Sequence, residues 1–410
     1  MGRKKCLWHP YTPPSVMPLD PRYFNGFQRL CLWWGLGWNP KRIYKLYLKN
    51  LKISDFRSYE FLDLNLEKGT NIIIGKNAQG KTNIIEAVNY FSTLKSHRFV
   101  SDKELIRSEK EKSVLKIEYN NEKRDMNAKI SLFKSSGREL LLNDIKCDNS
   151  SFIGSFNSVI FSPEDLNLIK GDKESRRKFL DMDICQVRPK YYKILKYYNY
   201  FLRNRNKLLK EEADNDLMSV YTDKMTEFGV EVLIYRLLFV ERLKETTKRI
   251  YKEISNNNEN LEIKYSSSLL KDNLTDKKII RENYYNLLEQ RKKEEEYLKS
   301  TTVGPHRDDL EFFIGGKSVK SFSSQGQMRT IILALKLSEL IFIEEITGNY
   351  PILLLDDILS ELDKERQERL FSYITKCQTI LTITDAQAYE DKNAKAFQVS
   401  KDSNGVSVIN

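Results

Sequence analysis

A run of eight residues with two glycines has the pattern of a phosphate-binding loop. It is Gly75-Lys76-Asn77-Ala78-Gln79-Gly80-Lys81-Thr82, between an apolar segment at 69–74 and a segment of helical character at 82–90. Glycines let backbone N–H groups turn toward phosphates, and the helix that follows adds a positive dipole end. We predict that these eight residues bind ATP, that Lys81 contacts the β- and γ-phosphates and is catalytic, and that Thr82 binds Mg²⁺. An ordinary glycine turn is the alternative, which the flanking strand and helix disfavour.

A pair of acids follows an apolar run much later in the chain. Residues 352–355 are apolar and lead directly into Asp356 and Asp357. A buried strand that ends in a carboxylate brings it beside the phosphate-binding loop of an open α/β sheet. We predict that Asp356 holds Mg²⁺ directly or through water, and that Asp357 orients or deprotonates the attacking water. An acidic pair alone could equally begin a helix, so this interpretation depends on the phosphate-binding loop.

A second helix start could also contact phosphate. Ser323-Ser324-Gln325-Gly326-Gln327 opens a long helical segment at 327–346. A start rich in Ser and Gly suits an anion, although a simple capped helix would have the same residues. One chain already has a phosphate-binding loop, so this second start suggests that Ser324, Gln325, Gly326 and Gln327 bind the ATP of another copy. ATP would then lie between two copies of the chain.

Composition excludes several classes of protein. The 410 residues carry a net charge of +11, but residues 1–45 hold eight basic residues and one acid, so the leader alone carries +7. A DNA-binding surface must therefore be local. Five scattered cysteines without a CxxC pair argue against a disulfide scaffold or structural zinc site and fit a reducing compartment. No apolar run is long enough to span a membrane, and we expect a cytoplasmic protein.

Composition also divides the chain. Residues 1–45 contain all four tryptophans and six of the ten prolines, so we expect a disordered, non-functional N-terminal extension, with a mobile accessory arm as the alternative. Residues 46–170 should form the first part of an ATPase head. There, alternation at 46–53 and 60–66 predicts strands, and alternation at 114–119, 127–133 and 138–143 predicts an antiparallel meander.

Residues 171–300 lack helix breakers. Gly229 is the only glycine between Gly171 and Gly304, and Pro189 is the only proline between Pro163 and Pro305. This predicts an inserted helical arm, with helices near 191–202, 232–243 and 277–299. Residues 301–410 return to α/β character, with strands at 352–355 and 378–383, and should complete the head.

These motifs together resemble the ABC-type ATPases of chromosome maintenance, and in particular the RecF recombination-mediator family. The motifs that carry the resemblance are Tyr47-Leu48-Lys49-Asn50, Asp55-Phe56-Arg57-Ser58-Tyr59, the 75–82 loop with Asn83-Ile84-Ile85-Glu86-Ala87, Ser96-His97-Arg98, Asp102-Lys103-Glu104-Leu105-Ile106, Phe161-Ser162-Pro163-Glu164-Asp165-Leu166, Arg176-Arg177-Lys178-Phe179-Leu180-Asp181, Gly304-Pro305-His306-Arg307-Asp308-Asp309, Ser324-Gln325-Gly326-Gln327, Leu355-Asp356-Asp357 and Ser360-Glu361-Leu362-Asp363.

The resemblance implies an α/β fold: an ABC-type ATPase head, with a mixed sheet and an antiparallel β meander, and an inserted helical arm. It implies that ATP closes a head-to-tail homodimer on gapped or junction DNA, and that slow hydrolysis releases it. It implies work with RecR and RecO to load the RecA recombinase, as a weak DNA-stimulated ATPase used as a switch. On this model residues 324–327 are the signature presented to the partner's ATP, and Asp363 lies in a loop that crosses the dimer interface.

The chain departs from the family pattern at three places. Ala78 stands where the family usually has glycine, Asp357 replaces a longer glutamate, and Thr384-Asp385 replaces the histidine switch of transporters. The shorter acid is a reason to expect slow hydrolysis. A nuclease-linked or transporter-like ATPase is the alternative, and the roughly 130-residue arm is too short for the long coiled coil of an SMC protein.

Basic residues near the phosphate-binding loop are candidates for DNA contacts, because phosphate contacts dominate the affinity of proteins for DNA. They are Lys95, Arg98, Lys103, Arg107, Lys134 and Arg138. Each alone could be an ordinary solvated cation. The sequence has no motif that reads bases, so sequence-specific binding is not expected.

Overall fold

The computed structural model describes residues 45–122, 124–211, 215–255, 259–270, 276–384, 394–403 and 405–409. The described residues belong to one compact unit, Tyr44–Asn410. The expectation for residues 1–45 falls outside the described residues except at Lys45. Among the residues described, no helix combines the length and apolarity needed to cross a bilayer.

The first sheet is antiparallel and confirms the predicted meander. Its strand order is β2-β1-β4-β5-β6-β7. Along β1 and β4 buried and less buried residues alternate, as expected for a sheet with one covered face. The strands are β1 (Leu46–Phe56), β2 (Tyr59–Asn65), β4 (Lys112–Asn121), β5 (Asp125–Phe133), β6 (Gly137–Leu142) and β7 (Ile145–Lys146).

The second sheet is mainly parallel, and the predicted phosphate-binding loop follows its strand β3. Its order is β15-β14-β3-β13-β12-β8, and only the β14–β15 pair is antiparallel. β12 and β13 are buried along their whole length, as apolar strands of parallel sheets usually are. The strands are β3 (Thr70–Ile74), β8 (Ser158–Phe161), β12 (Ile352–Asp356), β13 (Thr379–Ile383), β14 (Lys395–Lys401) and β15 (Ser407–Ile409).

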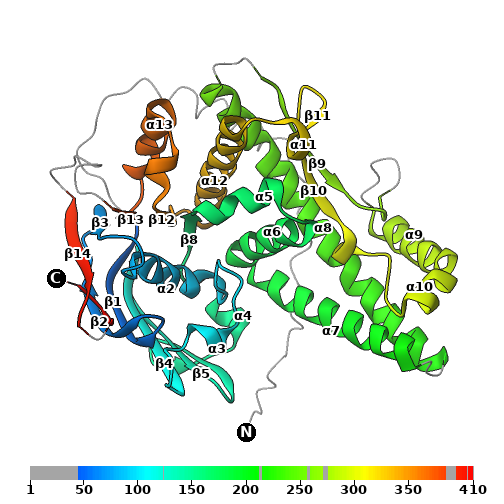
Figure 1. The fold of residues 1–410 in the computed structure, drawn as a ribbon. Coiled ribbons are helices and arrows are strands. Elements are labelled where there is room, and N and C mark those ends of the chain that lie inside the picture. The colour runs from blue at the N-terminus through cyan, green and yellow to red at the C-terminus, as the bar shows by residue number, and fades with distance from the viewer. Residues whose placement is uncertain are drawn as a thin grey trace, which may run out of the picture. The chain divides into compact units, whose positions relative to one another are not determined.

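Long helices dominate residues 173–298. Figure 1 shows α7 (Pro189–Glu211) lying along α8 (Asn215–Ile254), and the two pack against each other. The prediction of one helix over 277–299 is wrong, because Arg291 separates α9 (Lys277–Gln290) from α10 (Lys292–Leu298). α6 (Lys173–Val187) precedes this group.

These helices are interrupted by a strand that the sequence analysis did not predict. β9 (Leu261–Ser266) pairs antiparallel with β10 (Asp309–Ile314), which also pairs with β11 (Lys317–Ser318). Six residues with an incomplete alternation are a weak signal, and the partner strand lies more than forty residues away in sequence. The pairing therefore comes from tertiary structure.

Shorter elements and two further helices complete the described part. The helix α12 (Gln325–Thr347) confirms the predicted long helix, and α2 (Lys81–Thr93) packs against β12 and β8. The others are α3 (Asp102–Leu105), α4 (Asn149–Phe152), η3 (Pro163–Leu166), α5 (Asn167–Lys170), η4 (Pro305–Arg307), α11 (Val319–Phe322), η5 (Ile358–Glu361) and α13 (Lys364–Ile374).

Two buried arginines join the helices to β10 and the turn before it. Arg176 of α6 makes a bidentate ion pair with Asp309, with nitrogen–oxygen distances of 2.7 and 3.0 Å. Arg236 of α8 donates to both carboxylate oxygens of Asp181 at 2.9 Å and to the carbonyl oxygen of Pro305 at 2.7 Å. These two arginines and their partners therefore hold the helical segment in place, since bidentate pairs fix geometry as well as adding energy.

A buried charged cluster lies where α12 meets α6 and η3. The ammonium of Lys336 is 3.1 Å from a Glu339 oxygen and 3.4 Å from an Asp165 oxygen. Burial raises the pKa of Asp183 to about 7, and it raises the pKa of Glu339 well above its usual value. Lys336 therefore balances a group of acids that water does not reach.

We expect Lys336→Met to lower the free energy of unfolding by about 3–5 kcal/mol near neutral pH, because it leaves buried acids without their cation.

Asp183→Asn is the matched variant. The folded pKa of Asp183 lies above its unfolded value, so its stabilising contribution is lost as pH rises through about 7. Asp183→Asn should therefore gain more stability relative to the parent at about pH 8 than at about pH 5, because the parent loses this contribution progressively between the unfolded and folded pKa values of Asp183. Urea unfolding at both pH values measures this, and a less stable Asp183→Asn variant at the higher pH would contradict it.

Candidate functional site

The phosphate-binding loop lies between β3 and α2, as predicted. β3 ends at Ile74, and α2 begins at Lys81 after the N-cap residue Gly80. Residues 76–78 are exposed, and no side chain caps the start of α2. The N–H groups of the first helical turn are therefore free of side-chain partners at a positive dipole end, which suits an anion.

Both glycines of the loop are required by close neighbours. A Cβ at Gly75 would lie 2.5 Å from the carbonyl oxygen of Val399. Gly80 has a φ of 107°, and a Cβ there would lie 2.5 Å from Ser407 Oγ. Ser407 Oγ is also 2.7 Å from both the Gln79 carbonyl oxygen and Ser58 Oγ. The β14–β15 hairpin thus supports the loop, and no sequence pattern pointed to Ser407.

Lys81 is nearly fully buried and bends back over the loop. Its Nζ donates to the carbonyl oxygen of Gly75 at 2.9 Å and lies 3.4 Å from that of Lys76. The same nitrogen is 3.6 Å from Asp357 Oδ2. The structure therefore brings the predicted lysine and the second acid together across the carboxyl edge of the sheet.

Asp356 connects the loop to the centre of the sheet. Its Oδ1 accepts a hydrogen bond from Thr82 Oγ1 at 2.9 Å and another from Thr382 Oγ1 at 2.8 Å. Burial raises the pKa of Asp356 to about 6, partly offset by these two hydrogen bonds. Sequence reasoning missed Thr382, which stands on β13 between β3 and β12. The order of strands, unknown from sequence, puts it there.

Two of the unusual residues adopt left-handed backbone conformations. Asp357 has a φ of 50°, and its N–H donates to Thr382 Oγ1 at 2.9 Å. Ala78 has a φ of 63°, a conformation that costs a non-glycine residue about 1–2 kcal/mol. Ala78 therefore adopts a left-handed conformation that a glycine at this position would adopt without that cost. Asp385, the other departure, lies outside the described residues.

The helix start at residues 324–327 is capped by its own side chains. Ser324 Oγ accepts from the Gln327 N–H at 3.2 Å, and Gln327 Oε1 accepts from the Ser324 N–H at 2.8 Å. Gln327 Nε2 also donates to Glu259 at 2.6 Å. Ser324 and Gln325 are exposed, so their side chains and the first turn of α12 can be reached from outside.

Arg366 joins this helix start to Asp363. It donates to the carbonyl oxygen of Gly326 at 3.2 Å and to Thr330 Oγ1 at 2.8 Å, and it forms an ion pair with Asp363. Sequence reasoning missed Arg366, because it follows Asp363 in an otherwise ordinary charged helix. None of these partners belongs to the phosphate-binding loop, so the two predicted halves of the ATP site are separate clusters in one chain.

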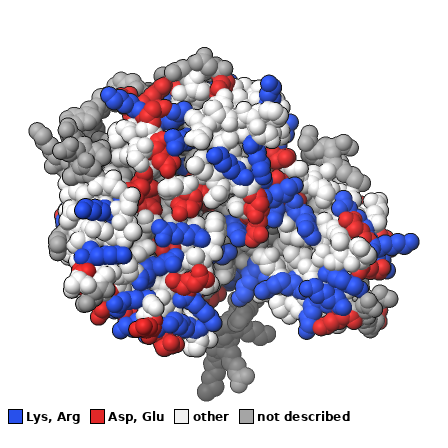
Figure 2. Space-filling model, in the orientation of Figure 1, with Lys and Arg blue, Asp and Glu red and all other residues white. Residues whose placement is uncertain are grey.

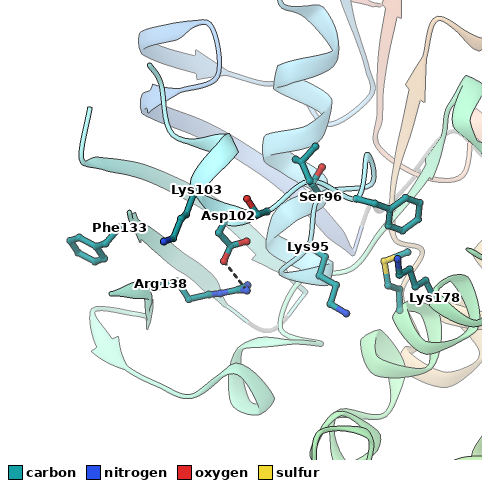
Figure 3. Close-up of a pocket in the computed structure, with 12 residues that line it drawn as sticks. Lys95, Ser96, Asp102, Lys103, Phe133, Arg138 and Lys178 are labelled. Atoms are coloured by element: carbon teal, nitrogen blue, oxygen red, sulfur yellow. Dashed lines mark ion pairs between the residues drawn. The ribbon is translucent and has the colours of Figure 1, made fainter. Parts of the chain in front are cut away.

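The six predicted DNA contacts fall into two groups. Lys95, Lys103 and Arg138 line one cavity, which Figure 3 shows. The other three are each near an acid: Arg107 is 2.9 Å from Glu60, Lys134 is 3.8 Å from Glu111, and Arg98 is 4.0 Å from Glu164. The structure thus brings together half of the set.

We expect Asp356→Asn to raise the melting temperature of the nucleotide-free protein at about pH 8. The pKa of Asp356 is raised to about 6, so its contribution to stability is lost as pH rises through that value. Asparagine keeps an oxygen for both threonine hydroxyls but carries no charge to hold Mg²⁺. Thermal unfolding with and without Mg²⁺ and ATP measures both effects. Equal Mg²⁺-dependent stabilisation of parent and variant would contradict the assignment.

Similarity to known proteins extends over most of the chain. The family model described as RecF/RecN/SMC N terminal domain matches residues 47–408. Proteins named DNA replication and repair protein RecF, from Clostridium perfringens strain SM101 and Clostridium novyi strain NT, are 38% and 40% identical over 360 residues. These matches cover 86% and 87% of this chain, and 98% of each relative.

Solved structures show the same fold. The recombination mediator protein RecF with ATP, in the RecFOR pathway, superimposes with a TM-score of 0.84 at 33% identity, over 91% of this chain and 100% of that one. An SMC head domain from Pyrococcus furiosus has a TM-score of 0.51 at 18% identity, over 89% and 96% of the two chains. The fold is that of an ABC-type ATPase head with several sheets and helices, and the chain belongs to the RecF family.

Proposed function

We propose that this chain binds ATP with Mg²⁺ and uses the nucleotide to control its hold on DNA during replication and recombinational repair. The observation that carries the proposal is the convergence of Lys81, Thr82 and Asp356 at the carboxyl edge of the parallel sheet. The relatives named as DNA replication and repair proteins support the process, and the RecF structure with ATP supports the ligand.

The donor atoms at this edge fit Mg²⁺. Thr82 and Asp356 offer a hydroxyl and a carboxylate oxygen, and Mg²⁺ prefers a few oxygen ligands of this kind with phosphates and water completing its shell. When bound there, Mg²⁺ would neutralise charge on the phosphates. The N–H groups of residues 75–82 and the ammonium of Lys81 would orient those phosphates. Asp357, whose Oδ2 lies 3.6 Å from Lys81 Nζ, would position the attacking water. Its side chain is shorter than the glutamate usual at this position, which is consistent with slow hydrolysis.

The second half of the site is proposed to act on the ATP of another copy. Ser324 and Gln325 are exposed. The adjacent Gly326 and Gln327 are hydrogen-bonded to Arg366 of α13 and to Glu259, and not to the loop of the same chain. Asp363, paired with Arg366, is exposed beside them. A head-to-tail homodimer would bring this surface to a partner's triphosphate. ATP would then make contacts in the closed dimer that it cannot make in the open state, and so it would favour closure.

We further propose that the protein is cytoplasmic and that residues 171–300 form an arm of a head made from residues 46–170 and 301–410. We also propose that it works with RecR and RecO type mediators to load a RecA recombinase on gapped or junction DNA. The basic surface available for DNA is local. Figure 2 shows acidic and basic side chains mixed over one face, with Lys and Arg most concentrated over α7.

We expect Ser324→Arg to leave ATP binding by the monomer unchanged and to block ATP-dependent dimerisation. The longer arginine side chain would occupy the space where the partner's phosphates are proposed to bind. Lys81→Met is the paired variant and should lose both ATP binding and dimerisation. Light scattering with a fluorescent ATP analogue separates the two properties. Nucleotide-dependent dimers of Lys81→Met would contradict the loop assignment, and dimers of Ser324→Arg would contradict the partner site.

We expect DNA to be bound more tightly with ATP than with ADP, because only the triphosphate holds the dimer closed. Fluorescence anisotropy with gapped DNA across a salt series is the measurement, since phosphate contacts make the logarithm of affinity fall linearly with the logarithm of salt concentration. The salt slope should be steeper with ATP if closure adds phosphate contacts. Identical affinities and slopes with the two nucleotides would defeat the proposed switch.

A further inference from the structure

A cavity of about 440 Å³ lies where the chain leaves the phosphate-binding helix α2. It is lined by residues from the segment after α2, from the β5–β6 hairpin and from α6. Figure 3 shows Lys103 and Arg138 at one end of the cavity and Lys178 at the other, with Lys95 between them. Elements far apart in the sequence therefore supply its four cations.

The cavity keeps a positive charge after its internal pairs are counted. Arg138 is paired with Asp102 at 2.9 Å, and Lys178 is paired with Glu174 at 2.7 Å. Lys95 and Lys103 are exposed, and neither forms a salt bridge with an acid in the described residues. Two ammonium groups are therefore available to an anionic ligand, and the paired Lys178 adds a third at the rim.

An exposed aromatic ring lines the same cavity. Phe99 is 47% exposed although phenylalanine normally buries its ring, and its φ of 57° is a strained left-handed value. The ammonium of Lys178 lies 5.0 Å from the ring centroid. An exposed ring among lysines is the combination that binds single-stranded nucleic acid, in which the base stacks and the cations hold the backbone.

We infer that this cavity binds an unpaired nucleotide of a DNA strand, with its base stacked on Phe99 and its phosphates near Lys95 and Lys103. The volume suits one small ligand group. A base inside a duplex has both faces covered by its neighbours, so stacking on the ring requires a base that has left the duplex. The inference rests on the proposed DNA-binding function and adds how a junction would be distinguished from a continuous duplex.

Hydrogen bonds connect the cavity to the nucleotide site. Ser96, in the cavity wall, donates to Glu86 of α2 at 2.5 Å and accepts from the Arg98 N–H at 3.1 Å. Arg57 holds the same Glu86 through two hydrogen bonds of 2.8 Å. The helix that starts at the phosphate-binding loop thus holds the backbone segment that carries Phe99.

The test uses the full chain with Mg²⁺ and ATP and two fluorescent DNAs, a blunt duplex and the same duplex with a short oligothymidine tail. We expect the parent protein to bind the tailed DNA more tightly. Phe99→Ala should lower affinity for the tailed DNA about tenfold and change affinity for the blunt duplex less than about twofold. Phe99→Tyr, which keeps a ring, should retain the preference. Lys103→Gln should weaken binding to the tailed DNA and reduce its salt slope by about one.

Two control variants separate the cavity from general effects. Phe61→Ala removes another exposed ring, on β2, and Lys196→Glu changes an exposed cation on α7. Both should leave the ratio of the two affinities at the parent value. As a second measurement, 2-aminopurine at the first unpaired position should be quenched by the parent protein and not by Phe99→Ala, because stacking on the ring causes the quenching.

The outcomes distinguish this inference from the proposed function. If the parent shows no ATP-dependent DNA binding, the proposed function fails and the inference fails with it. If the parent binds DNA but Phe99→Ala weakens both DNAs equally, or neither, the cavity inference alone is overturned. Phe99-dependent binding of a polyglutamate peptide without any preference for the tail would also overturn it, in favour of an acidic protein partner.

Discussion

One carboxylate oxygen, Oδ1 of Asp356, receives hydrogen bonds from Thr82 and Thr382 at the same time. The first hydroxyl belongs to the phosphate-binding helix and the second to the strand beside β12, so this atom sets the distance between loop and sheet. Burial raises the pKa of the carboxyl to about 6, which means that its charged form is held at a cost in stability. A cation at this edge would remove that cost.

The helix α2 links two sites because each lies at one of its ends. Its start faces the loop that we propose binds phosphates, and the segment after its end carries Ser96 and Phe99 beside the basic cavity. Glu86 lies between them and holds both Arg57 and Ser96. The loop and the cavity are therefore joined by a short covalent and hydrogen-bonded route through α2.

Some motif residues have a structural role that their motifs did not reveal. Arg176 pairs with Asp309 of β10, and Arg236, which holds Asp181 of α6, also donates to the carbonyl oxygen of Pro305. These contacts attach the helical segment to the strand β10 and the turn before it. Lys336 similarly balances acids from three elements. Charged groups removed from water need such partners, and breaking one pair costs more than the pair itself contributes.

The sequence by itself determined the phosphate-binding loop, the acidic pair, the meander and the long helices, because each depends on residue types and periods that are local. Tertiary structure alone decided the strand order that inserts Thr382 between loop and Asp356, and the hairpin that places Ser407 against Gly80. It also decided the pairing of β9 with β10 and the meeting of Arg366 with Gly326. These contacts join residues far apart in the chain, and no local pattern encodes which distant segments meet.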